Sequence, residues 1–181
     1  IEGGRDGDLV LSATPPAPVV IGIGPDTDGG AVLGIGVYAL AWVRDAARAE
    51  PRDLRAMIQR ENAVDTFTQV TGAMEDAKGA LTYSGITSTR LHPRQEVTFQ
   101  GSDGLIRLNC PFNPNVFDQA EVTLIRAGKP DCVQRFPGVN HYVLQGERFV
   151  RHIREGAPYP WTLEDARGTQ AMIDLVRASE I

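Results

Sequence analysis

A glycine-rich segment that leads into an apolar helix carries the residues best suited to chemistry. Gly34 and Tyr38 are one helical turn apart, so they share a face of the helix predicted from Gly30 to about Arg48. Each glycine inside a helix costs about 1 kcal/mol relative to alanine, and we expect close approach of another backbone or a ligand to compensate. The Tyr38 phenol can donate a hydrogen bond to a hydroxyl or carbonyl group of a ligand. The open alternative is a buried tyrosine whose hydroxyl is satisfied by the backbone.

Few other residues form a pattern that indicates chemistry. No pair among the 3 histidines has metal-ligand spacing, so no metal site is expected. His141 and Tyr142 begin a predicted helix, where they could contact a substrate or serve capping and packing. Lys78 and Lys129 fall in predicted turns, where solvated side chains are the rule. The acidic residues, Asp65 among them, form no suggestive pair, and turn or capping roles suffice for them.

The hydrophobic pattern beyond Pro51 changes from helical to alternating, which indicates strands. Strands are expected at 54–60, 67–74, 80–86, 95–100, 105–108, 121–126 and 132–136. A sheet of six or seven strands needs one face covered by helices. The sequence therefore predicts an α+β fold, with a large, mainly antiparallel sheet, helices packed on one face, and the other face open.

Two helices are expected to cover that sheet. The first runs from Asn140 to about Glu155 and ends at Gly156, a typical C-cap residue. The second follows the N-cap candidate Thr162. The stripes expected to be buried are Tyr142, Gly146, Phe149, Val150 and Ile153 on the first helix, and Ala166, Met172, Ile173 and Val176 on the second.

The run from Asp28 to Tyr38 resembles the active-site helix of the Gfo/Idh/MocA family of NAD(P)-dependent oxidoreductases. That helix reads Gly-Gly-Gly-x-Leu-x-Asp-x-Gly-x-Tyr or His. Gly29, Gly30, Leu33, Gly36 and Tyr38 fall into register, whereas Gly34 stands where the acidic residue belongs. The segments 97–106 and 140–166 also resemble the family, so the resemblance covers residues 29–181 almost throughout.

The resemblance implies two parts. Residues 1–28 resemble the end of a nucleotide-binding domain, where Thr14 and Pro15 would lie beside the cofactor, and residues 29–181 resemble the C-terminal domain. It implies that Tyr38 is catalytic and that Gly34, Tyr38, His141 and Tyr142 bind substrate. The family's catalytic lysine has no counterpart between Ala17 and Asp28. NAD or NADP is thus expected in the complete protein, and none is expected to be bound by this chain.

A competing interpretation concerns residues 18–24, whose apolar run and glycines mimic the start of a Rossmann unit. A dinucleotide fingerprint requires a third glycine for helix packing and close approach of the pyrophosphate. Thr27 occupies that place. Asp26 and Asp28 would repel phosphate at the helix start. A turn with flexible glycines is the better interpretation.

Composition restricts the class of protein. Apolar residues make up 42% and charged residues 23% of 181, which is typical of a globular domain and argues against disorder. A net charge of −5 provides no basic surface, so nucleic acid is not an expected partner. The apolar stretch 31–43 is too short to cross a membrane, and no secretory signal is visible. Cys110 and Cys132 are expected to be reduced thiols in a cytoplasmic protein.

Two functions fit these observations. The first is the substrate-binding and oligomerisation domain of an NAD(P)-dependent oxidoreductase that acts on a CH–OH group of a sugar, polyol or diol, inactive by itself. The second is a shortened, non-catalytic homologue that serves as a binding or assembly module. Tyr38 favours the first and Gly34 the second. The resemblance also implies a homodimer or homotetramer formed through the sheet face.

Overall fold

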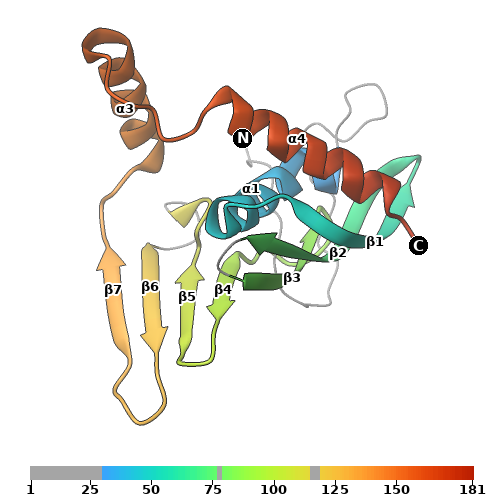
Figure 1. The fold of residues 1–181 in the computed structure, drawn as a ribbon, viewed down its shortest axis with the longest axis horizontal. Helices are drawn as coiled ribbons and strands as arrows, with labels where there is room; N and C mark the ends of the chain where they lie inside the picture. The colour runs from blue at the N-terminus through green and yellow to red at the C-terminus, as the bar shows by residue number, and fades with distance from the viewer. Residues whose placement is uncertain (1–29, 77–78, 115–118) are drawn as a thin grey trace. The chain divides into compact units, whose positions relative to one another are not determined.

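The computed structural model describes residues 30–76, 79–114 and 119–181, which form an α+β fold (Figure 1). Its strands belong to two antiparallel sheets, with orders β1-β2-β3 and β4-β5-β6-β7. The chain divides into a first unit, residues 1–97 and 168–181, and a second unit, residues 98–167. The α+β class is confirmed. The strands that the sequence assigned to one large sheet are divided between two, because the segment between Ser88 and Glu96, which contains Pro93, belongs to neither sheet.

The first unit combines the glycine-rich helix with the three-stranded sheet. Its elements are the π-helical turn η2 (Ala31–Gly36), α1 (Val37–Ala47), β1 (Pro51–Glu61), β2 (Val64–Asp76), β3 (Gly79–Ser88) and the part of α4 (Leu163–Ala178) that begins at Gly168. β1 and β2 are joined by a two-residue turn in which Asn62 and Ala63 have φ of 50° and 68°. Positive φ at both positions matches the twist of paired strands, which is why β1 and β2 extend further than predicted.

The core of the first unit lies between its sheet and its helices. The buried cluster takes residues from the helical segment, the strands and α4: Val32, Leu40, Ala56, Val70, Met74, Met172, Ile173 and Val176. The predicted burial of the last three is confirmed, whereas Ala166 is exposed. The segment that follows α4 continues this packing, because Ala56 N–H donates to Ser179 O (2.9 Å) and Ile181 N–H donates to Ala56 O (3.0 Å). These two bonds cover the outer edge of β1.

The second unit contains the remaining strands and a helix. Its elements are β4 (Glu96–Gln100), β5 (Leu105–Asn109), β6 (Ala120–Ile125), β7 (Cys132–Phe136) and α3 (His141–Glu155). The first two residues of β4 belong to the first unit. The predicted turn between β4 and β5 is confirmed, with Gly101 N–H bonded to Gly104 O at 2.9 Å. Cys110 is buried, Cys132 is exposed and both are free thiols.

The helix ends predicted from sequence are also observed. The Asn140 side chain accepts hydrogen bonds from two backbone N–H groups at the start of α3, and Gly156 ends this helix with φ of 67°. Thr162 Oγ1 accepts from Asp165 N–H at 3.1 Å ahead of α4. The predicted burial of the α3 stripe is wrong: no residue of α3 is buried. Periodicity shows that a helix has an apolar face, but burial requires a surface packed against that face.

Candidate functional site at the glycine-rich helix start

The predicted helix begins with a π-helical turn instead of an α-helical one. η2 gives way to α1 at Val37, one residue before Tyr38. Single π-helical turns are rare in proteins, and those that occur are often found at functional sites. Within η2 and α1, the residues 31, 32, 35, 36, 39 and 40 are buried, while Gly34 and Tyr38 are exposed. The predicted common face of Gly34 and Tyr38 is thus observed, and it points away from the core.

Position 30 must be glycine because a carboxylate from a distant strand occupies the space that a side chain would need. A Cβ atom at this position would lie 2.0 Å from Oδ1 of Asp65, which belongs to β2. The other carboxylate oxygen, Oδ2, accepts the Val32 N–H at 2.7 Å. Asp65 therefore caps the helix start from the sheet, a role that no local residue provides, since the N-cap residue is Gly30 itself.

Gly36 is explained by packing against β3. A Cβ atom there would lie 3.2 Å from Cγ2 of Thr87, closer than an ordinary contact. Thr87 also holds the first turn directly, because its hydroxyl donates to Ala31 O at 3.1 Å. Close approach of another backbone or a ligand was expected at Gly34 and Gly36, and at Gly36 the structure shows close approach of the Thr87 side chain instead.

Gly34 has no such packing reason. A Cβ atom at this position would meet nothing within 4 Å among the residues that the structure describes. The cost of this helix glycine, about 1 kcal/mol, is therefore not offset by a contact within the described chain. An exposed glycine beside an exposed phenol leaves room for a ligand next to that phenol.

Tyr38 is the most accessible chemical group of this face. Its side chain is 46% exposed, so the alternative in which Tyr38 is buried in the core does not hold. Tyr38 is placed by the turn before it, since η2 fixes the direction in which α1 starts.

The two other predicted substrate contacts lie in the second unit. The rings of His141 and Tyr142 have centroids 4.0 Å apart at the start of α3. The Tyr142 hydroxyl donates to Oδ1 of Asn113 at 3.2 Å, and its backbone N–H donates to Asn140. The structure thus pairs Gly34 with Tyr38 and His141 with Tyr142, each pair within its own unit. Thr14, Pro15 and the rival glycine-rich segment 18–24 lie outside the described residues.

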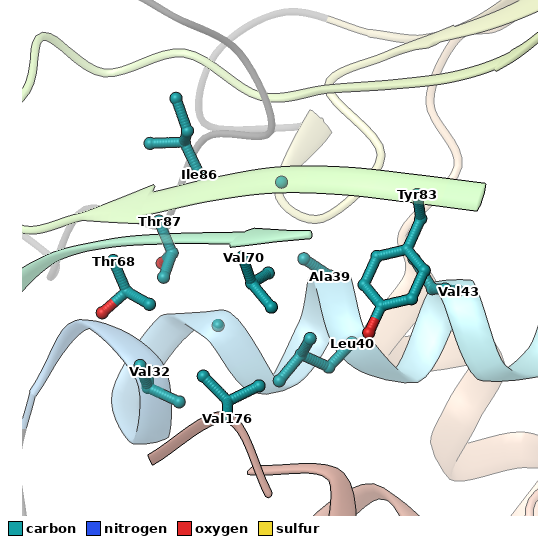
Figure 2. Close-up of a pocket in the computed structure, with 12 residues that line it drawn as sticks. Val32, Ala39, Leu40, Val43, Thr68, Val70, Tyr83, Ile86, Thr87 and Val176 are labelled. Atoms are coloured by element: carbon teal, nitrogen blue, oxygen red, sulfur yellow. The ribbon is translucent and has the colours of Figure 1, made fainter. Parts of the chain in front are cut away.

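A small cavity lies between the sheet and α1 of the first unit (Figure 2). Its volume is about 20 Å³, which is room for one water molecule, so it is not a substrate site. Two hydroxyl groups that line it, those of Thr68 and Tyr83, are buried with no partner among the described protein groups. Figure 2 shows the Tyr83 ring pointing from β3 toward α1. The same ring lies over Gly72 of β2, where a Cβ atom would be 2.7 Å from the Tyr83 hydroxyl.

Burial raises the pKa of the Tyr83 phenol well above its usual value near 10. Above about pH 10 the unfolded chain loses this proton while the folded chain keeps it, so the free energy of unfolding falls as pH rises. We expect Tyr83→Phe to reduce this alkaline loss of stability and to leave stability at neutral pH unchanged or higher by about 1 kcal/mol, because a buried hydroxyl without a partner is removed. Thermal unfolding between neutral and alkaline pH measures both effects. The exposed control Tyr142→Phe should keep the wild-type pH profile, and an equal profile in Tyr83→Phe would contradict the assignment.

The described residues contain neither a candidate metal cluster nor a helix that could span a membrane. No group of three or more His, Cys, Asp or Glu side chains within 30–76, 79–114 and 119–181 could hold a metal ion. Among the helices in the same ranges, none combines the length and hydropathy that crossing a bilayer requires.

Comparison with known proteins gives a sequence relative and several solved structures with a similar fold. The chain is 31% identical over 155 residues to the uncharacterized oxidoreductase ORF334 of Rhizobium meliloti, and the match covers 83% of the chain and 46% of that protein. The chain has an oxidoreductase homologue. It spans about half the length of this relative. No family model matches the chain.

The solved structures show that the fold occurs in sugar-modifying oxidoreductases. KijD10, a 3-ketoreductase from Actinomadura kijaniata solved with TDP-benzene and NADP, matches with a TM-score of 0.70 and 22% identity, over 92% of this chain and 50% of that one. The UDP-N-acetylglucosamine 3-dehydrogenase GnnA from Acidithiobacillus ferrooxidans matches with a TM-score of 0.69 and 15% identity, over 87% and 50%. In both comparisons this chain aligns with half of the longer solved chain.

Proposed function

We propose that this chain is the C-terminal substrate-binding and oligomerisation domain of an NAD(P)-dependent oxidoreductase of the Gfo/Idh/MocA type, inactive by itself, which acts on a CH–OH group of a sugar, polyol or diol. The exposed face that Gly34 and Tyr38 share at the glycine-rich helix start carries this proposal. The oxidoreductase relative supports it independently, because the similarity extends over 155 residues.

Tyr38 is the residue that we assign to chemistry. A nicotinamide cofactor, when bound by the complete protein, exchanges hydride with the substrate carbon. The phenol of Tyr38 would donate a hydrogen bond or a proton to the oxygen on that carbon during reduction, and its phenolate form would receive the hydroxyl proton during oxidation. Gly34 lets the sugar or diol approach this phenol without a side chain in between.

The substrate and cofactor contacts elsewhere are part of the same proposal. His141 and Tyr142 would contact the substrate from the start of α3, where the Tyr142 hydroxyl already bonds to an amide side chain. Thr14 and Pro15 would lie beside NAD or NADP in the complete protein. The NADP in KijD10 supports such a cofactor. The free cysteines are consistent with a cytoplasmic protein, and we propose neither a nucleic acid nor a membrane as its partner.

An apolar sheet face in the second unit supports a homodimer or homotetramer. Strand alternation places the following residues of β5, β6 and β7 on one face: Ile106, Leu108, Val122, Leu124, Cys132 and Phe136. Ile106 and Phe136 are among the exposed large apolar side chains. Gln134 is the polar member of this face. The opposite face carries the charged Arg107, Glu121 and Arg135 together with Leu105, Ile125 and Val133, so the first face is the less charged one and the one that we propose for association with a second copy.

A titration with NADH and NADPH tests the proposed function. The complete gene product should bind one of the two with micromolar affinity, whereas this chain alone should not bind either in that range, because it lacks most of the nucleotide-binding domain and with it most of the cofactor contacts. Micromolar binding of NADH or NADPH by this chain alone would overturn the proposal that this chain binds substrate while the rest of the complete protein binds the cofactor. A complete gene product that contains no nucleotide-binding domain and binds neither cofactor would favour the shortened, non-catalytic module, for which the absence of an acid at Gly34 is the motivating observation.

A further inference from the structure

The first turn of the Tyr38 helix is held by two side chains of the sheet. Asp65 of β2 accepts the Val32 N–H at 2.7 Å, and Thr87 of β3 donates to Ala31 O at 3.1 Å. The first hydrogen bond satisfies the backbone donor of Val32, and the second satisfies the backbone acceptor of the neighbouring residue Ala31. The turn therefore cannot rotate or shift along the sheet without losing both hydrogen bonds.

The Asp65 carboxylate also suits this position electrostatically. The N–H groups of the first turn of a helix have no partner within the helix and carry partial positive charge. Gly30 has an extended backbone with φ of 178° and offers no side-chain cap. Asp65 comes from 33 residues further along the chain and takes that role, with its Oδ1 in the space that any side chain at position 30 would need.

We infer that Asp65 is a positioning residue for Tyr38, and that Gly30 is glycine in order to admit the Asp65 carboxylate. This inference rests on the proposed function for its catalytic consequence. The carboxylate fixes the π-helical turn, the turn sets the start of α1, and the start of α1 directs the Tyr38 phenol toward the substrate side. Placement errors of about 1 Å in a reacting group can cost on the order of 10²-fold in rate, so a distant cap can control turnover.

A mutant cycle between Gly30 and Asp65 tests the inference. Asp65→Ala removes the cap and Gly30→Ala displaces the carboxylate. Each substitution should therefore lower kcat of the complete oxidoreductase about tenfold or more, with a smaller change in KM. Because both act on one contact, the double variant should be no slower than the slower single variant. Asp65→Asn keeps an oxygen that can accept the Val32 N–H and should recover most of the rate. Multiplied losses in the double variant, or wild-type kcat in a folded Asp65→Ala protein, would overturn the inference.

A second measurement needs no turnover. The ring signals of Tyr38 in the NMR spectrum of this chain, assigned through Tyr38→Phe, should shift in Asp65→Ala and Gly30→Ala and return toward wild type in Asp65→Asn. Glu75→Ala is the matched control on the same strand, since Glu75 pairs at the surface with Arg52 at 3.3 Å and should leave these signals in place. Unmoved Tyr38 signals in a folded Gly30→Ala protein would refute the inference even if Asp65→Ala does not fold. Shifted signals together with full activity of Tyr38→Phe would leave the positioning role standing and refute the proposed function.

Discussion

Tyr38→Phe is expected to lower kcat/KM of the complete oxidoreductase by about 10²-fold or more, the usual contribution of a positioned proton donor. The substitution removes one oxygen atom from a side chain that is 46% exposed, so the fold and its stability should be little affected. Steady-state reduction of a keto-sugar with NADPH or NADH, followed through the loss of the reduced cofactor, gives the rate. Unfolding in denaturant, measured in parallel, shows whether the loss is chemical or structural.

Tyr83→Phe is the matched control for this experiment. It makes the same chemical change in the same unit, but at a phenol that lines the internal cavity and has no access to a substrate. Its kcat/KM should remain at the wild-type level. Equal activity of Tyr38→Phe and wild type would remove Tyr38 from the mechanism, and an equal loss in both variants would indicate a general effect of disturbing the first unit.

The parts of the site that depend on local spacing could be predicted from sequence. Residues four apart share a helix face, and Gly34 and Tyr38 do so in the structure. Alternation of apolar and polar residues located the strands, and cap residues located the ends of α3. These patterns follow from backbone geometry within a few residues, which the sequence states directly.

The parts that depend on distant segments could not be predicted. A turn or capping role was considered sufficient for Asp65, but the sequence did not indicate that it caps a helix 33 residues earlier, because that requires knowing where β2 lies relative to η2. The π-helical turn could not be predicted for the same reason. Its glycines are compatible with an α-helix, and it is the contacts with Asp65 and Thr87 that hold the turn in place. Whether a face is buried is also decided by its neighbours. The apolar stripe of α3 was expected to be covered, and it is exposed.

The second large effect is expected in the core that supports the site. Met172 of α4 is 0% exposed and belongs to the cluster that contains Val32 and Leu40 of the helix segment and Met74 of β2. Met172→Ala should lower the free energy of unfolding by about 2–5 kcal/mol, because it removes buried methylene and methyl groups and leaves a cavity. Alanine has the highest helix propensity, so the substitution brings no helix penalty that could account for the loss. Denaturant unfolding should show a lower midpoint with an unchanged slope.

Leu175→Ala separates packing from any effect of altering α4 itself. Leu175 is three residues further along the same helix and is 46% exposed, so its truncation should change stability by about 0.5 kcal/mol or less. A large loss for Met172→Ala and a small one for Leu175→Ala would establish that α4 packs into the first unit through the face that carries Met172. Similar losses at both positions would contradict this packing. Small losses at both positions would mean that the sheet, without α4, supports the turn that directs Tyr38.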